Sequence, residues 1–169
     1  TNPVELAAGW LIVAGRLDEA SALMRDRIDR LASGGEGQAG LASSMRCQWI
    51  RQLAVARQDD RVRALYPALV AEDGGNAPLL ALASLVYNRG TAEDDRIAEG
   101  LLSRALALSP DDPNIQNNLA YLWADRGENL DRAEQLLSQA VTADPQPHIQ
   151  DSWAWVRYKK GEFRPALAM

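Results

Sequence analysis

Cysteine and histidine are almost missing from this chain, which has one of each, Cys47 and His148, in 169 residues. A single cysteine excludes a disulfide within the chain and a zinc site built from several cysteines. A single histidine excludes a multi-histidine metal site and removes the usual general base for a serine or cysteine nucleophile. We therefore expect no metal, no cofactor and no catalytic residue, and we predict that the chain is not an enzyme.

Long apolar runs are missing as well. No stretch approaches the roughly 18 residues that a membrane-spanning helix needs. Residues 4–14 contain Glu5 and follow no basic leader, so they are not typical of a signal peptide. Hydrophobic residues make up 47% of the chain and charged residues 24%, as in soluble globular proteins. We expect a soluble segment, cytoplasmic or periplasmic, that inserts no helix into a membrane, and one thiol is compatible with both compartments.

Positive charge is scarce, with 18 lysine and arginine residues against 23 aspartate and glutamate residues. The resulting net charge of −5 argues against binding of a phosphate backbone, so we expect no nucleic acid partner. Lysine is limited to Lys159 and Lys160. Together with the abundance of alanine, this preference for arginine indicates a bacterial source with a GC-rich genome.

The alternation of polar and β-branched residues that a strand requires is also absent. Ala, Leu, Arg and Glu recur instead at three- and four-residue spacing, which is typical of helices. Turn signals divide the chain into about ten helices, paired as residues 4–31, 41–73, 76–109, 113–144 and 147–169. We predict a single all-α domain over residues 1–169, with a flexible glycine-rich loop at 33–40. Pro67 is expected to kink or shorten its helix.

The strongest pattern is a helix pair that repeats. One copy contains Leu119, Ala120, Trp123, Gly127, Ala133, Leu137, Ala140 and Pro145, an upstream copy contains Leu82, Ala83, Val86, Gly90, Ala98, Leu102, Ala105 and Pro110, and a third contains Trp153, Ala154, Gly161 and Ala166. Ala83, Ala120 and Ala154 are 37 and 34 residues apart. Alanine lets two helices approach closely, while leucine fills the space around the contact. Because one such pair cannot bury its apolar stripe alone, neighbouring pairs must stack.

These residues resemble the tetratricopeptide repeat (TPR) of bacterial proteins, a helix–turn–helix unit of about 34 residues. The resemblance is strong over residues 76–169, looser over 4–31, and rests on position more than on motif over 41–73. It implies a right-handed superhelix of antiparallel helix hairpins, whose concave face is lined by the first helix of each pair. That face binds peptides or partner proteins in the family. The chain departs from the family at Arg157, which stands where an aromatic residue is expected.

The resemblance leaves two functions open. The first is a non-catalytic protein–protein interaction scaffold that binds a peptide or partner protein on its concave face. The second is a regulatory or substrate-docking region of a larger enzyme, whose catalytic domain lies outside this sequence. Because the chain starts without an initiator Met and stops inside a repeat, we expect a fragment of a longer protein. The apolar edge of the truncated last repeat would allow a homo-oligomer.

Helical spacing places a second stripe opposite the packed alanines. It combines aromatic, amide and carboxylate side chains: Tyr87, Asn88, Asn117, Tyr121, Asp125, Asp151, Trp155 and Tyr158. Rigid aromatics beside hydrogen-bonding groups are enriched at protein-binding surfaces, so we predict that this stripe is the partner-binding groove. Aromatics that pack between adjacent repeats have the same spacing. The sequence leaves both interpretations open.

The other candidate groups point to no chemistry. Residues 35–40 match the G-x-G-x-x-G pattern, but a helix and not a strand precedes them, so we expect no bound dinucleotide. Cys47 lies on a helix with Ala, Ile and Leu and is expected to be a small buried hydrophobe. His148 is expected at the edge of the groove, where the helix start brings it near Asp151.

Overall fold

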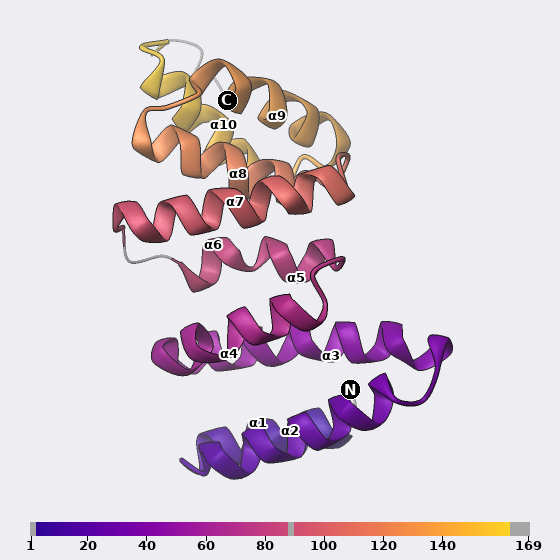
Figure 1. Cartoon of the computed structure of the whole chain (residues 1–169). Helices are drawn as coiled ribbons and strands as arrows, with labels where there is room; N and C mark the ends of the chain where they lie inside the picture. Colours follow the sequence, from indigo (N-terminus) through magenta and orange to yellow (C-terminus); the bar gives the residue numbers. More distant parts are fainter. Residues whose placement is uncertain (1–2, 88–89, 163–169) are drawn as a thin grey trace. The chain divides into compact units, whose positions relative to one another are not determined.

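The computed structural model describes residues 3–87 and 90–162 and builds them from helices and the turns between them (Figure 1). This part of the chain contains no strand, so the predicted all-α fold class is confirmed. The backbone packs into two compact units, Thr1–Val86 and Tyr87–Met169. The first unit contains α1 (Pro3–Val13), α2 (Leu17–Ala32), α3 (Glu36–Val55), α4 (Asp59–Glu72), α5 (Ala77–Ala81) and α6 (Ala83–Val86). The second contains α7 (Ala92–Leu108), α8 (Pro113–Arg126), α9 (Leu130–Ala143) and α10 (Pro147–Lys159).

Short polar side chains cap the starts of α7 and α8 in the second unit. Thr91 precedes α7, and its Oγ1 atom accepts a hydrogen bond from the backbone N–H three residues later at 3.1 Å. Asp112 precedes α8, and its Oδ1 atom accepts from the N–H groups of Asn114 and Ile115 at 2.9 and 3.2 Å. Pro113 occupies the first helical position, where its missing N–H is not needed. These caps satisfy donors that a helix start leaves open, and so they fix where each helix begins.

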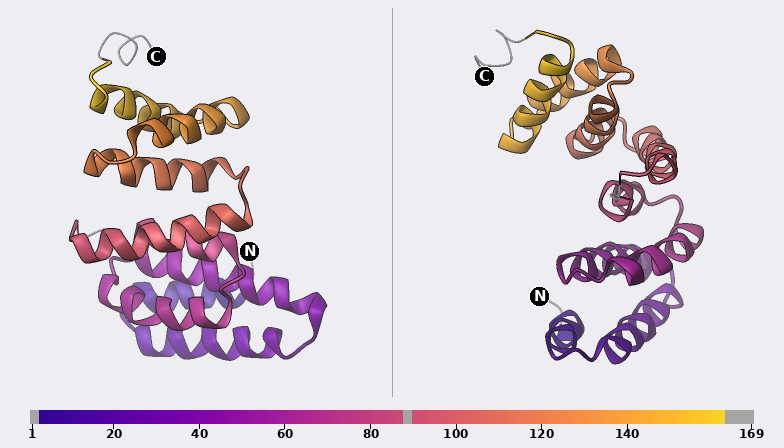
Figure 2. Two further views of the ribbon diagram at one scale, coloured as in Figure 1. Left: turned by 45° about the horizontal axis from the view of Figure 1, so that its top comes forward. Right: turned by 90° about the vertical axis from the view of Figure 1, so that its left-hand side faces the viewer.

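Helices α8 and α9 form an antiparallel hairpin (Figure 2). Helix α8 ends at Gly127, whose φ of 71° lies in the left-handed region that glycine adopts without steric cost. The chain then reverses, so the start of α8 meets the end of α9. The Nε2 atom of Gln116 donates to Oε1 of Gln139 at 3.3 Å across these two ends. Helix α10 packs against both members of the hairpin.

Alanine lies at the helix contacts of the second unit. Ala98 of α7, Ala120 of α8 and Ala133 of α9 have no exposed surface. The leucines around these contacts are buried as well: Leu102, Leu119 and Leu137. A methyl group at each contact lets the helix axes come close while the leucines fill the remaining volume. The predicted packed face is therefore confirmed for α7, α8 and α9, whereas Ala154 of α10 is only half-buried.

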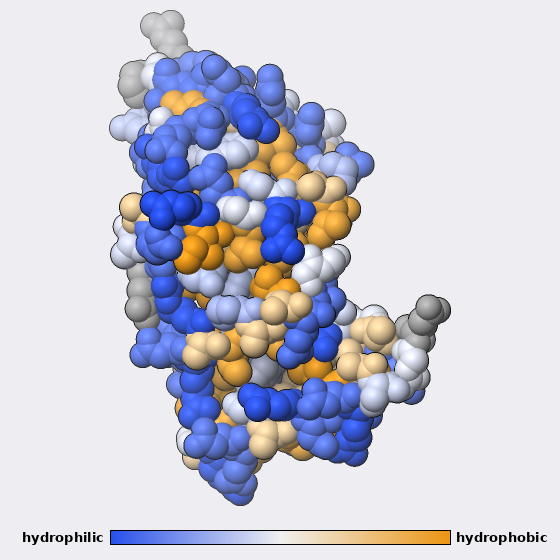
Figure 3. All heavy atoms as spheres, viewed as in Figure 1, coloured by the Kyte–Doolittle hydropathy of each residue, from blue (hydrophilic) through white to orange (hydrophobic). Residues whose placement is uncertain are grey.

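Larger side chains fill the core of the first unit. Met24 of α2 and Ile50 and Leu53 of α3 have no exposed surface. Tyr66 of α4 is equally buried, and its hydroxyl donates to the carbonyl oxygen of Leu79 at 2.8 Å, which ties α4 to α5. Hydrophilic residues cover most of the surface drawn in Figure 3, with hydrophobic residues showing between them on both units.

The predicted flexible loop at residues 33–40 is wrong beyond Gly35, because α3 begins at Glu36 and includes Gly37 and Gly40. Gly35 makes the reversal, with a φ of 89°. A glycine inside a helix costs up to about 1 kcal/mol relative to alanine. The packing of later α3 residues into the core outweighs this cost, since tertiary contacts supply most of the stability of a helix in a protein.

Two other segments differ from the expected helix pairs. Helix α4 runs through Pro67 to Glu72, so Pro67 does not shorten it, because Val62 and Tyr66 anchor this helix in the core. The first helix of the predicted pair at 76–109 is interrupted at Leu82, between α5 and α6. That pair also spans the two compact units, so the joining of its helices stays a prediction, as does a single domain over 1–169.

Replacing Ala120 or Ala133 by leucine is expected to lower the free energy of unfolding by about 1 to 3 kcal/mol, because the contact has no room for further carbons. Gln135→Ala, on the exposed side of α9, is the matched control and is expected to stay within about 0.5 kcal/mol. Urea unfolding followed by circular dichroism measures both. Equal losses at the two classes of site would show that the packed face is assigned wrongly.

Candidate functional site

Helices α8 and α10 lie beside each other in the second unit. Two contacts join them at matching positions. The Nε2 atom of His148 lies 3.4 Å from Oδ1 of Asn114, and the Nζ atom of Lys159 donates to the backbone oxygen of Asp125 at 3.1 Å. In both pairs the partners are 34 residues apart, which is the length of one repeat. Equivalent positions of the two helices therefore face each other from their first turns to their last. His148 was expected near Asp151, and the structure shows its ring in contact with Asn114.

Three of the predicted aromatic side chains belong to these two helices. Tyr121 of α8 is 48% exposed and Tyr158 of α10 is 52% exposed. The half-buried ring of Trp155 stacks on Tyr158, with ring centroids 5.5 Å apart and planes 12° from parallel. The Nζ atom of Lys159 lies 4.9 Å from the centroid of the Trp155 ring, a cation–π contact. These contacts hold the aromatic pair in one arrangement, which lowers the entropic cost of binding a partner there.

The other predicted stripe residues differ in accessibility. Asp125 and Asp151 are exposed. Asn117 is only 7% exposed, and its buried Oδ1 atom has no hydrogen-bond partner among the described residues. The expectation that Asn117 lies on the open side of α8 is therefore wrong, because α8 packs against α7, α9 and α10 and keeps only a narrow strip open. Tyr87 is half-buried, and Asn88 lies outside the described residues.

A cluster of charges fixes α10 to α9. Glu134 of α9 accepts hydrogen bonds from Arg157 at 3.3 Å and from Lys160 at 2.6 Å, and Lys160 also pairs with Asp131 at 2.9 Å. The hydrogen bond from Lys160 is the main cause that lowers the pKa of Glu134, and the same bond raises the pKa of Lys160. The guanidinium of Arg157 lies 4.7 Å from the ring centroid of Trp153. Arg157 thus packs on an aromatic ring, at the position where the resemblance led us to expect an aromatic residue.

Glu99 of α7 ties α7 to α8. Its carboxylate accepts a hydrogen bond from the indole N–H of the buried Trp123 and another from Arg126, both at 2.8 Å. The bond from Trp123, assisted by Arg126, holds the pKa of Glu99 below its ordinary value of 4.5 against the opposing effect of burial. Both helices that carry the candidate surface are therefore anchored to their neighbours by ionised carboxylates.

Glu99→Gln keeps an oxygen that accepts from Trp123 but removes the negative charge. Because folding lowers the pKa of Glu99, the charge stabilises the fold fully above the unfolded pKa, near 4.5, and this stabilisation is lost as the pH falls through the lower folded value. We expect the variant to be less stable by about 1 kcal/mol at neutral pH. Urea unfolding at neutral pH and at about pH 3.5 should show this deficit shrinking in acid. A deficit that does not change with pH would contradict the role of the charge.

The histidine, the cysteine, the carboxylates and the glycine pattern form no metal, thiol or nucleotide site among the described residues. In residues 3–87 and 90–162, His, Cys, Asp and Glu side chains form no group of three that could hold a metal ion. Cys47 is half-buried, and burial raises the pKa of its thiol, so little thiolate is present at neutral pH. The glycine pattern at 35–40 leads into α3 and follows another helix. Among the helices of the same residues, none has the length and apolar content needed to cross a membrane.

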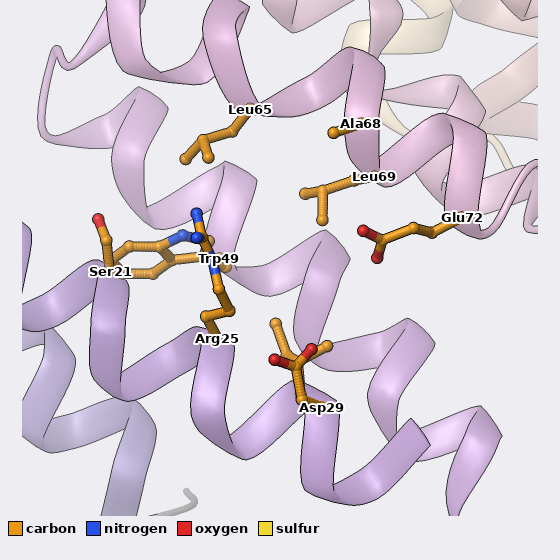
Figure 4. Close-up of a pocket in the computed structure, with 9 residues that line it drawn as sticks. Ser21, Arg25, Asp29, Trp49, Leu65, Ala68, Leu69 and Glu72 are labelled. Carbon is orange, nitrogen blue, oxygen red and sulfur yellow. The ribbon is translucent and has the colours of Figure 1, made fainter. Parts of the chain in front are cut away.

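The first unit contains a cavity of about 370 Å³ that the sequence pattern does not predict (Figure 4). Its labelled lining consists of Ser21, Arg25 and Asp29 from α2, Trp49 from α3, and Leu65, Ala68, Leu69 and Glu72 from α4. Leu65 and Leu69 point down from α4 toward Trp49, while Asp29 and Glu72 lie on the side away from Ser21. Glu72 also pairs with Arg46 at 3.5 Å. Because three helices supply the lining, spacing along one helix does not reveal this cavity.

Comparison with known proteins finds the same repeat. Residues 98–155 match the family model of the tetratricopeptide repeat. A TPR repeat-containing protein of Pseudomonas aeruginosa is 27% identical over 161 residues, which cover 92% of this chain and 25% of that protein. The chain therefore spans only a quarter of the length of this relative.

Solved structures share the fold. A thermophilic TPR protein of Thermus thermophilus superimposes with a TM-score of 0.65 and 20% identity, over 98% of this chain and 85% of its own. A putative kinesin light chain with nearly identical TPR-like repeats, from Podospora anserina, gives a TM-score of 0.62 and 18% identity, over 98% and 89% of the two chains. At such low identity these likenesses establish the fold and leave the partner open.

Proposed function

We propose that this chain, a tetratricopeptide-repeat protein of the bacterial kind, is a non-catalytic scaffold that holds a peptide or another protein on a face of its first helices. Proteins built from this repeat generally serve as interaction scaffolds and not as enzymes. One observation carries the proposal: α8 and α10 lie in register one repeat apart, and their exposed aromatics lie between the two contacts that join the helices.

The chemistry of this surface, which we call the α8–α10 face, favours a partner with apolar and hydrogen-bond-donating groups. Tyr121 and Tyr158 offer large aromatic areas with few rotatable bonds, which makes them suitable anchors for apolar side chains. Asp125 and Asp151 are exposed carboxylates that accept hydrogen bonds from backbone N–H or basic groups. The face therefore suits a segment in which apolar residues alternate with donors.

A docking or regulatory role within a larger enzyme is the second candidate. It is favoured by the length of the Pseudomonas relative, of which this chain covers 25%. The sequence of the whole protein distinguishes the two candidates, because a catalytic domain beside the repeats would support the second. A homo-oligomer formed through the last repeat would involve residues 163–169, which lie outside the described residues.

Tyr121→Ala is expected to weaken binding of a protein captured from native lysate by at least about 2 kcal/mol, because the variant removes a central aromatic anchor. The captured protein is identified by mass spectrometry, and its affinity is then measured by calorimetry with wild type and variant. Gln135→Ala is the matched control on the second helix of the same hairpin. Thermal unfolding confirms that both variants are folded. Equal affinity of Tyr121→Ala and wild type for every captured protein would place the binding surface elsewhere.

A further inference from the structure

The cavity of Figure 4 lies mainly between two second helices, and so it is not part of a face of first helices. Helices α2 and α4 supply its lining, and Trp49 is the one lining residue from α3. The apolar part of the lining is well packed: Ile28 and Trp49 are only 5% and 4% exposed, and Leu65 and Leu69 are half-buried. A volume of about 370 Å³, with apolar walls and a few polar groups, is typical of a site for a small molecule.

Two opposite charges that line the cavity are left unpaired. Arg25 and Asp29 of α2 are exposed, and neither forms an ion pair with any described residue. In Figure 4 both side chains point from α2 toward α4 and stay apart. Asp26 and Arg30, also four residues apart on α2, do form an ion pair. The order of the charges explains the difference, because an acid before a base is the favourable order along a helix and a base before an acid is not.

The other charges around the cavity are already compensated. Glu72 pairs with Arg46 at 3.5 Å. Asp18, which shares a neighbouring cavity with Arg25, pairs with Arg61 at 2.8 Å. The cavity therefore offers one uncompensated cation and one uncompensated anion, both from α2. A ligand with a single charge would meet a like charge on one of them, whereas a ligand with both charges matches both.

We propose that this cavity binds a free amino acid with an apolar side chain, which joins one positive and one negative charge to an apolar group. The ligand carboxylate pairs with Arg25, whose guanidinium donates two parallel hydrogen bonds to such a group, and the ligand ammonium pairs with Asp29. Residues four apart on a helix have Cβ atoms about 5 to 6 Å apart, which suits two charged groups bound to one carbon. The apolar side chain packs against Trp49, Leu65 and Leu69. This site does not depend on the α8–α10 face.

Calorimetry on the whole chain, with L-leucine and L-phenylalanine as probes, tests the proposal. We expect at least one of them to bind with a dissociation constant below about 1 mM. Analogues that lack one charge should bind at least tenfold more weakly: isoamylamine and isocaproate for leucine, phenethylamine and hydrocinnamate for phenylalanine. Glycine, which keeps both charges and lacks the apolar group, should bind at least tenfold more weakly as well.

Variants of α2 then assign the site. Arg25→Gln and Asp29→Asn should each weaken binding of the amino acid at least tenfold. Arg30→Gln and Asp26→Asn make the same changes at exposed positions of the same helix that do not line the cavity, and these matched controls should leave binding unchanged. Circular dichroism verifies that all four variants are folded, as expected for substitutions at exposed side chains.

Three results would overturn the proposal: no binding of either amino acid, equal binding of an analogue with one charge, or equal losses in the α2 variants and their controls. Binding of the uncharged N-acetyl-leucinamide as tightly as leucine would also overturn it, in favour of a side chain of a partner protein. Each of these results leaves the α8–α10 face untouched.

Discussion

The close approach of helices at alanine is the constraint on which the second unit depends. Ala98, Ala120 and Ala133 have no exposed surface, and a larger side chain at any of them would push neighbouring helices apart. With the helices at this spacing, α10 packs on the α8–α9 hairpin. Two contacts, each between residues 34 apart, show that α8 and α10 are in register over their length. A binding face made from two helices requires that register.

Charged contacts also hold the same two helices to α7 and α9. Glu99 holds α8 to α7 through Trp123, and Glu134 holds α10 to α9 through Arg157 and Lys160. The groups that anchor the helices are therefore largely separate from the aromatics proposed to contact a partner. Lys159 is the exception, because it joins α10 to α8 and also lies against Trp155. This separation lets the binding residues vary while the fold is kept.

Local chemistry made the recognition of the repeat, its all-α fold class and many helix boundaries predictable. The spacing around Ala120 identifies a packed face, and Asp112 before Pro113 marks a helix start, because each depends on residues within one or two turns. Contacts between distant segments were not predictable in this way. Asn117 is buried because neighbouring helices pack around α8, and the cavity of Figure 4 takes its lining from three helices, α2, α3 and α4.

Amide hydrogen exchange on the complex with a captured partner tests the central claim most directly, because it reports the contact surface without any substitution. The proposed function predicts slower exchange in α8 and α10 of the second unit when the partner is bound, with little change in α7 and α9. Slower exchange confined to α7 and α9 would contradict it and would assign binding to the second helices of the repeats.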